Sequence, residues 1–316
     1  MTRPVIAIHG GCGVMAKLDL TEADWADARR DLAEALRAGW RVLTAGGSAV
    51  DAVEAAIVVM EDSPQFNAGH GAALNAAGIH ELDASIMRGA DLGAGAVALV
   101  RRIRNPIRAA RALLEQGGPV MLGATEADNF AARSGLDMVE QSYFTTERRV
   151  KSLASLKAKA LEGTLKAASE AEKHGTVGAV ALDSAGHLAA GTSTGGYNNK
   201  PEGRIGDTPI IGAGTYARNG VCAVSGTGAG EFFIRHAVGH EIASRIAYLG
   251  ESLATAADQV IKSDLASYGI GAGIVSIDAY GNIAAPFNTD GMFRGWIDAD
   301  GNLSVGTHAE VTTVSL

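Results

Sequence analysis

The strongest constraint on the fold is a hairpin in the second half of the chain whose strands are apolar at almost every position. Thr176-Val-Gly-Ala-Val-Ala-Leu-Asp183 is a continuous apolar run, Ser184-Ala-Gly186 is a turn, and His187-Leu-Ala-Ala-Gly-Thr-Ser-Thr194 returns. A strand with one face in water alternates apolar and polar residues, whereas a continuous apolar run is typical of a strand covered on both faces. The sequence therefore predicts a sheet that has a packed layer on each side.

A second hairpin near the C-terminus repeats this pattern. Asp-x-x-Gly-x-(Leu/Ile)-Ala-Ala stands at 183–190 and again at 278–285. From apolar periodicity we expect helices at 21–45, 49–61, 105–116, 125–134, 231–249 and 252–266, strands at 4–9, 82–87, 94–100, 221–225, 274–278 and 283–287, and glycine-rich loops at 9–13, 63–71 and 226–230. Because hairpins lack the crossover helices of a parallel sheet, we predict mixed α+β layers, and the length allows one large domain or two medium ones.

The charge balance excludes several classes of function. The 316 residues carry a net charge of -8, whereas nucleic-acid binding needs a basic face. The arginines between 101 and 111 are mixed with apolar residues and followed by acidic ones, which is typical of a solvated helix face. No apolar run reaches the length of a membrane span, and the N-terminus has no pattern of a secretory leader. Cys12 and Cys222 lie far apart and form no disulfide framework, so we expect a cytoplasmic protein.

Residues 147–175 differ in composition from the segment that follows them. They are rich in Lys, Ala, Glu and Ser and contain few large apolar residues. They could form a weak helix, but they have little apolar surface to bury, so we interpret them as an exposed linker. The apolar strand then begins abruptly at Thr176.

An exposed linker followed by a rigid strand is what cleavage before Thr176 would require. A threonine hydroxyl is a weak nucleophile unless a base takes its proton. The α-amine of an N-terminal threonine, with a pKa of about 7.7–8.0, can be that base. Gly175 adds no Cβ that would hinder attack on its own carbonyl. The alternative is that Thr176 is an ordinary first residue of a strand.

Two further loops carry groups that suit a small anionic or zwitterionic ligand. Gly226-Thr-Gly-Ala-Gly-Glu231 lies between a predicted strand and a predicted helix, where backbone N–H groups favour anions. It matches neither the P-loop nor the complete dinucleotide fingerprint. In Gly203-Arg-Ile-Gly-Asp207, an arginine could bind a carboxylate and an aspartate an ammonium group, although a surface ion pair is an equal alternative.

With these motifs in order, the chain resembles the plant-type (type 2) L-asparaginase/isoaspartyl peptidase family of N-terminal nucleophile (Ntn) hydrolases. The resemblance covers nearly the whole chain. It rests on the segments His9-Gly-Gly-Cys-Gly13, Phe66-Asn-Ala-Gly69, His80-Glu-Leu-Asp-Ala84, Gly175–Asp183, Ala190–Gly196, Gly203–Asp207, Gly226–Glu231 and Pro286-Phe-Asn-Thr-Asp-Gly-Met292. Cys12 departs from the family, which usually has alanine there, and a small buried thiol leaves the resemblance intact.

The resemblance implies a single domain over residues 1–316, folded as a four-layer αββα sandwich. It implies that the chain cuts itself between Gly175 and Thr176 into an α subunit, 1–175, and a β subunit, 176–316. It implies that Thr176 is the nucleophile and that Thr194 orients it. The other implied site residues are Thr227 and Gly228 in the oxyanion hole, Arg204 for the substrate carboxylate, Asp207 with Gly230 for its ammonium group, and Asn67 supporting the active-site loop. Gly228 also lines the substrate site.

The resemblance also implies that catalysis requires no cofactor and that a structural sodium ion binds main-chain carbonyls. Those carbonyls belong to Met60, Glu61, Ser63, Phe66, Ala68 and His70. The expected assembly is a dimer of αβ heterodimers that acts on a small molecule and binds no nucleic acid or membrane. A zinc site at His236 and His240, four residues apart beside Glu241, is disfavoured because no third ligand is evident.

The implied reaction is hydrolysis of β-aspartyl (isoaspartyl) dipeptides and of L-asparagine to L-aspartate. A glycosylasparaginase-like hydrolase is the nearest alternative, and the absent leader and disulfides argue against it. A non-catalytic protein whose glycine loops bind a ligand is the alternative from another class.

Overall fold

The computed structural model describes residues 2–13, 21–161 and 175–316. Its centre is a nine-stranded sheet in the order β13-β12-β11-β1-β5-β6-β2-β3-β4, and a second sheet has the order β10-β9-β8-β7. The strands of the large sheet are β1 (Val5–Gly13), β2 (Leu82–Arg88), β3 (Ala94–Val100), β4 (Met121–Gly123), β5 (Val177–Leu182), β6 (Leu188–Thr194), β11 (Gly291–Ile297), β12 (Asn302–Gly306) and β13 (Val311–Ser315). The second sheet contains β7 (Thr215–Arg218), β8 (Cys222–Gly228), β9 (Ala272–Asp278) and β10 (Ile283–Ala284).

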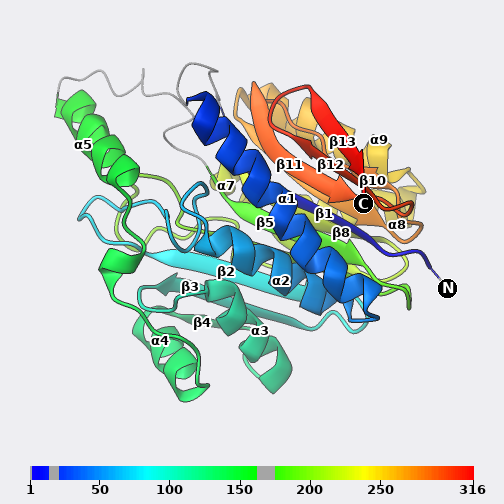
Figure 1. Ribbon diagram of the computed structural model, residues 1–316, viewed down its shortest axis with the longest axis horizontal. Coiled ribbons are helices and arrows are strands. Elements are labelled where there is room, and N and C mark those ends of the chain that lie inside the picture. Colours follow the sequence, from blue (N-terminus) through cyan, green and yellow to red (C-terminus); the bar gives the residue numbers. More distant parts are fainter. Residues whose placement is uncertain (1, 14–20, 162–174) are drawn as a thin grey trace.

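Helices cover the outer face of each sheet, which gives the four layers αββα (Figure 1). The large sheet is covered by α1 (Glu22–Thr44), α2 (Ala49–Asp62) and α3 (Pro106–Gln116). The small sheet is covered by α8 (Val238–Leu249) and α9 (Leu253–Asp258). The remaining described helices are α4 (Ala124–Arg133), α5 (Glu147–Leu161), α7 (Gly230–His236) and the short turns η1 (Gln141–Tyr143), η3 (Gln259–Leu265) and η4 (Ala266–Tyr268). The predicted α+β sandwich is confirmed.

The β5–β6 hairpin lies in the middle of the large sheet, and its side chains alternate between two hydrophobic cores. Val177, Ala179 and Ala181 pack beneath the helices, whereas Val180 and Leu182 pack between the two sheets. The two-sided burial read from the continuous apolar run is therefore confirmed, and it has a direct consequence for the site. By the same alternation, Thr176 faces the space between the sheets.

Several expected boundaries are right. The helix start at Thr21 is fixed by a capping box with Asp24, and the next helix is capped by Ser48 in the same way. The repeated Asp-x-x-Gly turn is also real, because Asp183 and Asp278 each accept hydrogen bonds from the backbone N–H groups two and four residues later.

Four expectations about local structure are wrong. Residues 9–13 continue strand β1 and do not form a loop, since Gly11–Gly13 pair with Gly291–Phe293 of β11. The segment 226–228 likewise continues strand β8. The expected helix 231–249 is broken at Ala237, which takes a left-handed conformation (φ 46°) between α7 and α8. The strands β4 and β7 are too short to give a periodic signal.

The fourth error concerns the segment interpreted as an exposed linker. Residues 147–161 form helix α5, and Leu153 and Leu156 on one side of it are buried. The composition gave little signal for a packed helix because the buried side chains of α5 are two leucines. The rest of the predicted linker, 162–174, lies outside the described residues.

Candidate active site

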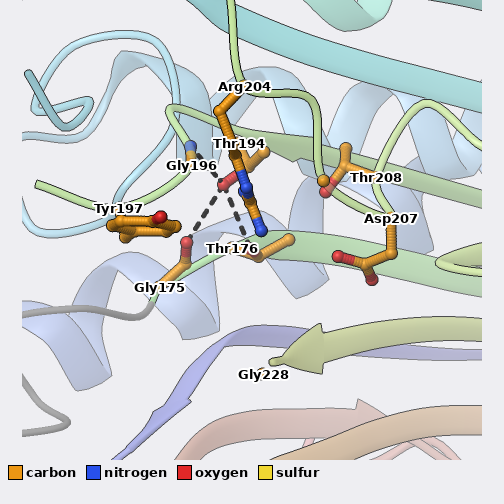
Figure 2. A pocket seen from close by; sticks show the side chains of 10 residues that line it. Gly175, Thr176, Thr194, Gly196, Tyr197, Arg204, Asp207, Thr208 and Gly228 are labelled. Carbon is orange, nitrogen blue, oxygen red and sulfur yellow. Dashed lines mark hydrogen bonds between the residues drawn. The ribbon is translucent and has the colours of Figure 1, made fainter. Parts of the chain in front are cut away.

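The register of the β5–β6 hairpin brings two of the predicted threonines together. Val177 pairs with Ser193, so Thr176 lies opposite Thr194 where the hairpin opens. Both threonines are buried. The Thr176 hydroxyl donates to Thr194 Oγ1 at 3.0 Å, and the Thr194 hydroxyl donates to the Gly175 carbonyl at 3.1 Å (Figure 2). The Gly196 N–H also donates to Thr194 Oγ1, at 3.0 Å.

This arrangement fixes the direction of each proton around Thr194. A hydroxyl has one proton and two acceptor lone pairs. The Thr194 proton is used on the Gly175 carbonyl, so its oxygen receives the protons of Thr176 and Gly196. Thr194 therefore orients the Thr176 hydroxyl and polarises the carbonyl that precedes it.

Asn67 is the second donor to the same carbonyl. Its Nδ2 lies 2.7 Å from the Gly175 oxygen and 2.6 Å from the Gly196 oxygen, and its Oδ1 accepts from the Ala73 N–H at 2.6 Å. Two neutral donors thus converge on the carbonyl oxygen of the residue that precedes the threonine. Such an arrangement stabilises negative charge that develops on a carbonyl oxygen.

A cleft opens on the other side of Thr176. Its lining comprises Gly175, Thr176, Thr194, Gly196, Tyr197, Arg204, Gly206, Asp207, Thr208 and Gly228. Figure 2 shows the Arg204 side chain extending over Thr176, with Asp207 beside it. The structure therefore brings five predicted residues, Thr176, Thr194, Arg204, Asp207 and Gly228, to one cleft.

The Arg204 guanidinium is held in place from two sides. Nε and Nη2 donate to the carboxylate of Glu231, each at 3.0 Å, and the group lies 4.8 Å from the centre of the Tyr197 ring. The arginine is thus ion-paired, but with Glu231 and not with Asp207 as the sequence alternative had it, and the pairing does not use the whole guanidinium. A guanidinium has five N–H groups, and this pairing uses one edge of it.

Glycine at position 230 leaves the space that the Arg204 and Asp207 side chains occupy beside it. A Cβ on Gly230 would come within 2.6 Å of Asp207 Oδ1 and 2.9 Å of Arg204 Nη2. Gly230 is the first residue of α7, so the helix start packs directly against both side chains.

The two residues of the predicted oxyanion hole are neighbours at the end of β8, and only Gly228 lines the cleft. Gly228 lines the cleft and has a φ of 135°, which glycine tolerates. Thr227 is buried, and its Oγ1 accepts from the Cys12 N–H at 3.4 Å. That contact leaves the Thr227 proton to be donated elsewhere.

Sequence reasoning missed the role of the His9-Gly-Gly segment. His9 is buried, and its Nδ1 lies 3.0 Å from the Thr176 carbonyl oxygen while Nε2 lies 2.9 Å from Ser225 Oγ. A carbonyl only accepts, so Nδ1 carries the proton and Nε2 accepts from Ser225. Burial lowers the pKa of His9 to about 3, which keeps the ring neutral. His9 therefore holds the nucleophile's backbone and has no free nitrogen to act as a base.

Gly11 lies directly against the peptide bond between Gly175 and Thr176. A Cβ on Gly11 would come within 2.9 Å of Gly175 Cα and 3.1 Å of the Thr176 nitrogen. Its φ of 108° is also a conformation that other residues rarely adopt. The two consecutive glycines after His9 were the available signal, but a glycine pair after a strand is too common to be specific.

The predicted cation loop is tightly wound and rich in carbonyl oxygens. The His70 N–H donates to the Glu61 carbonyl at 2.7 Å, and a Cβ on Gly69 would come within 2.3 Å of that oxygen. The Glu61 carboxylate accepts from Ser193 Oγ at 2.6 Å and from the Ile107 N–H at 3.0 Å, while its Oε2 is buried without a hydrogen-bond partner. Main-chain carbonyl oxygens are ligands that suit a hard cation such as sodium. Burial raises the pKa of the Glu61 carboxyl to about 8, so this side chain supplies no negative charge at neutral pH.

The other candidate groups considered from the sequence lie apart from this cleft. The break at Ala237 separates His236 from His240, and in the part of the chain that the structure describes we find no cluster of His, Cys, Asp and Glu that could bind a metal. Burial raises the pKa of the Cys222 thiol to about 12, so it stays protonated and unreactive. Within residues 2–13, 21–161 and 175–316, no helix combines the length and apolar character needed to cross a bilayer.

Comparison with known proteins agrees with this geometry. A family model described as Asparaginase matches residues 2–307. The isoaspartyl peptidases of Salmonella typhimurium and Escherichia coli are 42% and 43% identical, each over 98% of this chain and over 100% and 98% of their own lengths. The isoaspartyl peptidase/L-asparaginase of Mus musculus is 46% identical over 73% of this chain and 69% of its own. The chain therefore belongs to the asparaginase family.

Proposed function

We propose that this protein is an autoproteolytic threonine amidohydrolase that hydrolyses β-aspartyl dipeptides and L-asparagine to L-aspartate. The observation that carries the proposal is the Gly175 carbonyl, which accepts from both Asn67 and Thr194 beside the Thr176 hydroxyl. The names of the relatives, isoaspartyl peptidase and isoaspartyl peptidase/L-asparaginase, support the substrate class.

The first reaction would divide the chain into 1–175 and 176–316. Thr176 Oγ attacks the Gly175 carbonyl carbon, and the peptide C–N bond breaks as the Thr176 nitrogen takes up a proton. The ester formed between Gly175 and Thr176 Oγ is then hydrolysed by water. The products are a carboxylate at Gly175 and an N-terminal threonine with a free hydroxyl and a free amine.

The second reaction would use that amine as the base. It takes the Thr176 hydroxyl proton while Oγ attacks the β-carbonyl of the substrate, and ammonia or an amino acid leaves. Water hydrolyses the β-aspartyl ester and releases aspartate. Arg204 would bind the substrate carboxylate through its remaining N–H groups, and Asp207 with the Gly230 carbonyl would bind the ammonium group. The Thr227 hydroxyl and Gly228 N–H would stabilise the oxyanion.

The cleaved halves would remain together because their strands are interleaved. In the large sheet β1 lies between β11 and β5, and β2 lies beside β6, so strands of 1–175 alternate with strands of 176–316. Net charge gives no such attraction, since the first half carries 20 basic and 22 acidic residues and the second 7 and 13. We expect a dimer of these αβ units in the cytoplasm.

A sodium ion bound by the main-chain carbonyls of Met60, Glu61, Ser63, Phe66, Ala68 and His70 belongs to the proposal as a structural element. Its effect would be to hold the loop that carries Asn67, and no cofactor would take part in the reaction.

The test is hydrolysis by the full chain after incubation at neutral pH. We expect aspartate from β-aspartyl dipeptides and from L-asparagine. Activity confined to glycan-linked asparagine would favour the glycosylasparaginase-like alternative. Saturable ligand binding with neither cleavage nor hydrolysis would favour a glycine-loop binding protein and contradict the proposal.

A further inference from the structure

The helix within the segment expected to be a linker begins with two arginines that reach the loop carrying Asn67. Figure 1 shows α5 extending from the body of the molecule, with its first turn nearest the core. Arg148 Nη2 donates to the carbonyls of Pro64 and Gln65, at 3.1 and 2.9 Å. Arg149 Nε donates to the Gly71 carbonyl at 2.6 Å.

The N–H and the carbonyl of Gly71 are both hydrogen-bonded to residues 144–149. Its N–H donates to the Phe144 carbonyl at 2.9 Å, and its carbonyl accepts from Arg149. The loop is wound so closely here that a Cβ on Gly71, whose φ is 97°, would come within 2.8 Å of the Phe66 carbonyl oxygen. A small displacement of Gly71 must therefore move its neighbours in the loop.

Asn67 lies between the carbonyls that the two arginines hold. It is connected to the reacting carbonyl by one hydrogen bond and to the 195–196 turn by two, through the Gly195 N–H and the Gly196 carbonyl. Neither arginine lines the cleft, so neither touches the reacting atoms or the substrate groups. The contacts of the arginines are with the loop, and those of the loop are with Gly175.

We propose that Arg149, assisted by Arg148, is a positioning residue that holds Asn67 against the Gly175 carbonyl by fixing loop 64–71. This inference rests on the proposed function. It assigns to the start of α5 a role in self-cleavage that its linker-like composition does not suggest. Because Arg204 and Asp207 lie outside the loop, loss of these arginine contacts should slow self-cleavage and leave substrate hydrolysis by the cleaved enzyme unchanged.

The first experiment measures the self-cleavage rate of the full chain. Removing a charge-assisted hydrogen bond with Arg149→Met should slow cleavage about 10- to 100-fold. Arg149→Lys keeps the charge without the Nε donor and should recover only part of the rate. The matched control is Lys157→Met, which removes a positive charge from the exposed side of the same helix and should cleave at the wild-type rate.

Two further measurements separate positioning from a general loss of structure. Added ethylguanidinium should accelerate cleavage of Arg149→Ala, whereas ethylammonium at the same concentration should not. In enzyme that has already been cleaved, Gly175 is no longer the reacting carbonyl, so Arg149→Met should leave both kcat and KM for a β-aspartyl dipeptide within about 2-fold of wild type. A variant that is merely misfolded would show neither the selective rescue of cleavage nor normal hydrolysis after cleavage.

A double-mutant cycle tests whether Arg149 acts through Asn67. Arg149→Met should slow cleavage of the Asn67→Ala chain by less than about 2-fold. If the two effects multiply, or if Arg149→Met cleaves as fast as wild type, the positioning role is wrong while the proposed function stands. If the wild-type chain itself neither cleaves nor hydrolyses, the proposed function fails.

Discussion

The two sides of Thr176 are built from different chemistry. On the side of Gly175, neutral donors, Asn67 Nδ2 and the Thr194 hydroxyl, converge on one carbonyl. On the side of the cleft, the groups beside Thr176 are a guanidinium and a carboxylate, Arg204 and Asp207. Neutral donors suit a carbonyl that becomes negative only transiently, whereas a fixed pair of opposite charges suits a zwitterion. Self-cleavage and substrate turnover should therefore be separable by mutation.

Thr176 supplies the attacking oxygen on both sides, so its loss should have the largest effect. Thr176→Ala removes the oxygen that attacks in both reactions, so we expect no self-cleavage and no hydrolysis of β-aspartyl dipeptides. Gel analysis of the full chain over days, with the dipeptide assay, checks this. A variant that still divided at the wild-type rate would show that another group is the nucleophile.

Asn67→Ala should affect the Gly175 side. Loss of one donor to a developing oxyanion slows a reaction about 100- to 1,000-fold, so cleavage should take correspondingly longer. Asn129→Ala, the same truncation on the exposed face of α4, is the matched control and should cleave normally. Equal cleavage rates for the two variants would remove Asn67 from the account.

Arg204→Met should affect only the cleft side. We expect kcat/KM for a β-aspartyl dipeptide to fall about 10- to 100-fold, the value of a charge-assisted hydrogen bond. The rate of self-cleavage should stay within about 2-fold of wild type. Arg235→Met, which removes an exposed arginine from the neighbouring helix α7, should leave both rates unchanged. A large loss of cleavage in Arg204→Met would mean that the two sides are not independent.

The smallest expected effect is a pH dependence of stability that originates at His9. Burial lowers its pKa from 6.5 to about 3. Between these values the unfolded chain binds a proton that the native ring does not, so the free energy of unfolding falls as the pH decreases through this window. The contribution is at most about 1.4 kcal/mol per pH unit. Urea unfolding of wild type and His9→Gln between pH 7 and 5 should show a shallower slope for the variant. Parallel slopes would mean that His9 is protonated in the native state.

The sequence predicts structure well where a local pattern is compatible with a single local structure. The apolar run from Thr176 requires cover on two faces, and β5 has it. Ser48 and Asp51 form a capping box with one geometry. The local sequence pattern predicts the wrong structure where pairing with a distant strand determines it. Gly11–Gly13 have the composition of a loop, but they form a strand because they pair with β11. Helix α5 was interpreted as a linker because contacts of its first turn are with a distant part of the sequence, where Arg148 and Arg149 donate to carbonyls of residues 64–71.

The candidate site shows the same division. Thr176, Thr194, Arg204 and Asp207 stand in recognisable motifs, and the fold brings them to one cleft. The contacts that hold them come from residues whose types carry no signal. His9 reaches Ser225 across the two sheets, and that approach needs Gly178, where a Cβ would come within 1.9 Å of Ser225 Oγ. Only the paired sheets reveal such contacts.

The central claim is that Thr176 becomes the N-terminus of a second chain by self-cleavage. The most direct measurement is the intact mass, with the N-terminal residue of each species, of purified protein incubated at neutral pH. The account predicts two fragments, 1–175 and 176–316, with Thr176 as the new N-terminus. A single 32.3 kDa chain that persists for days, or a cut at a different bond, would contradict it.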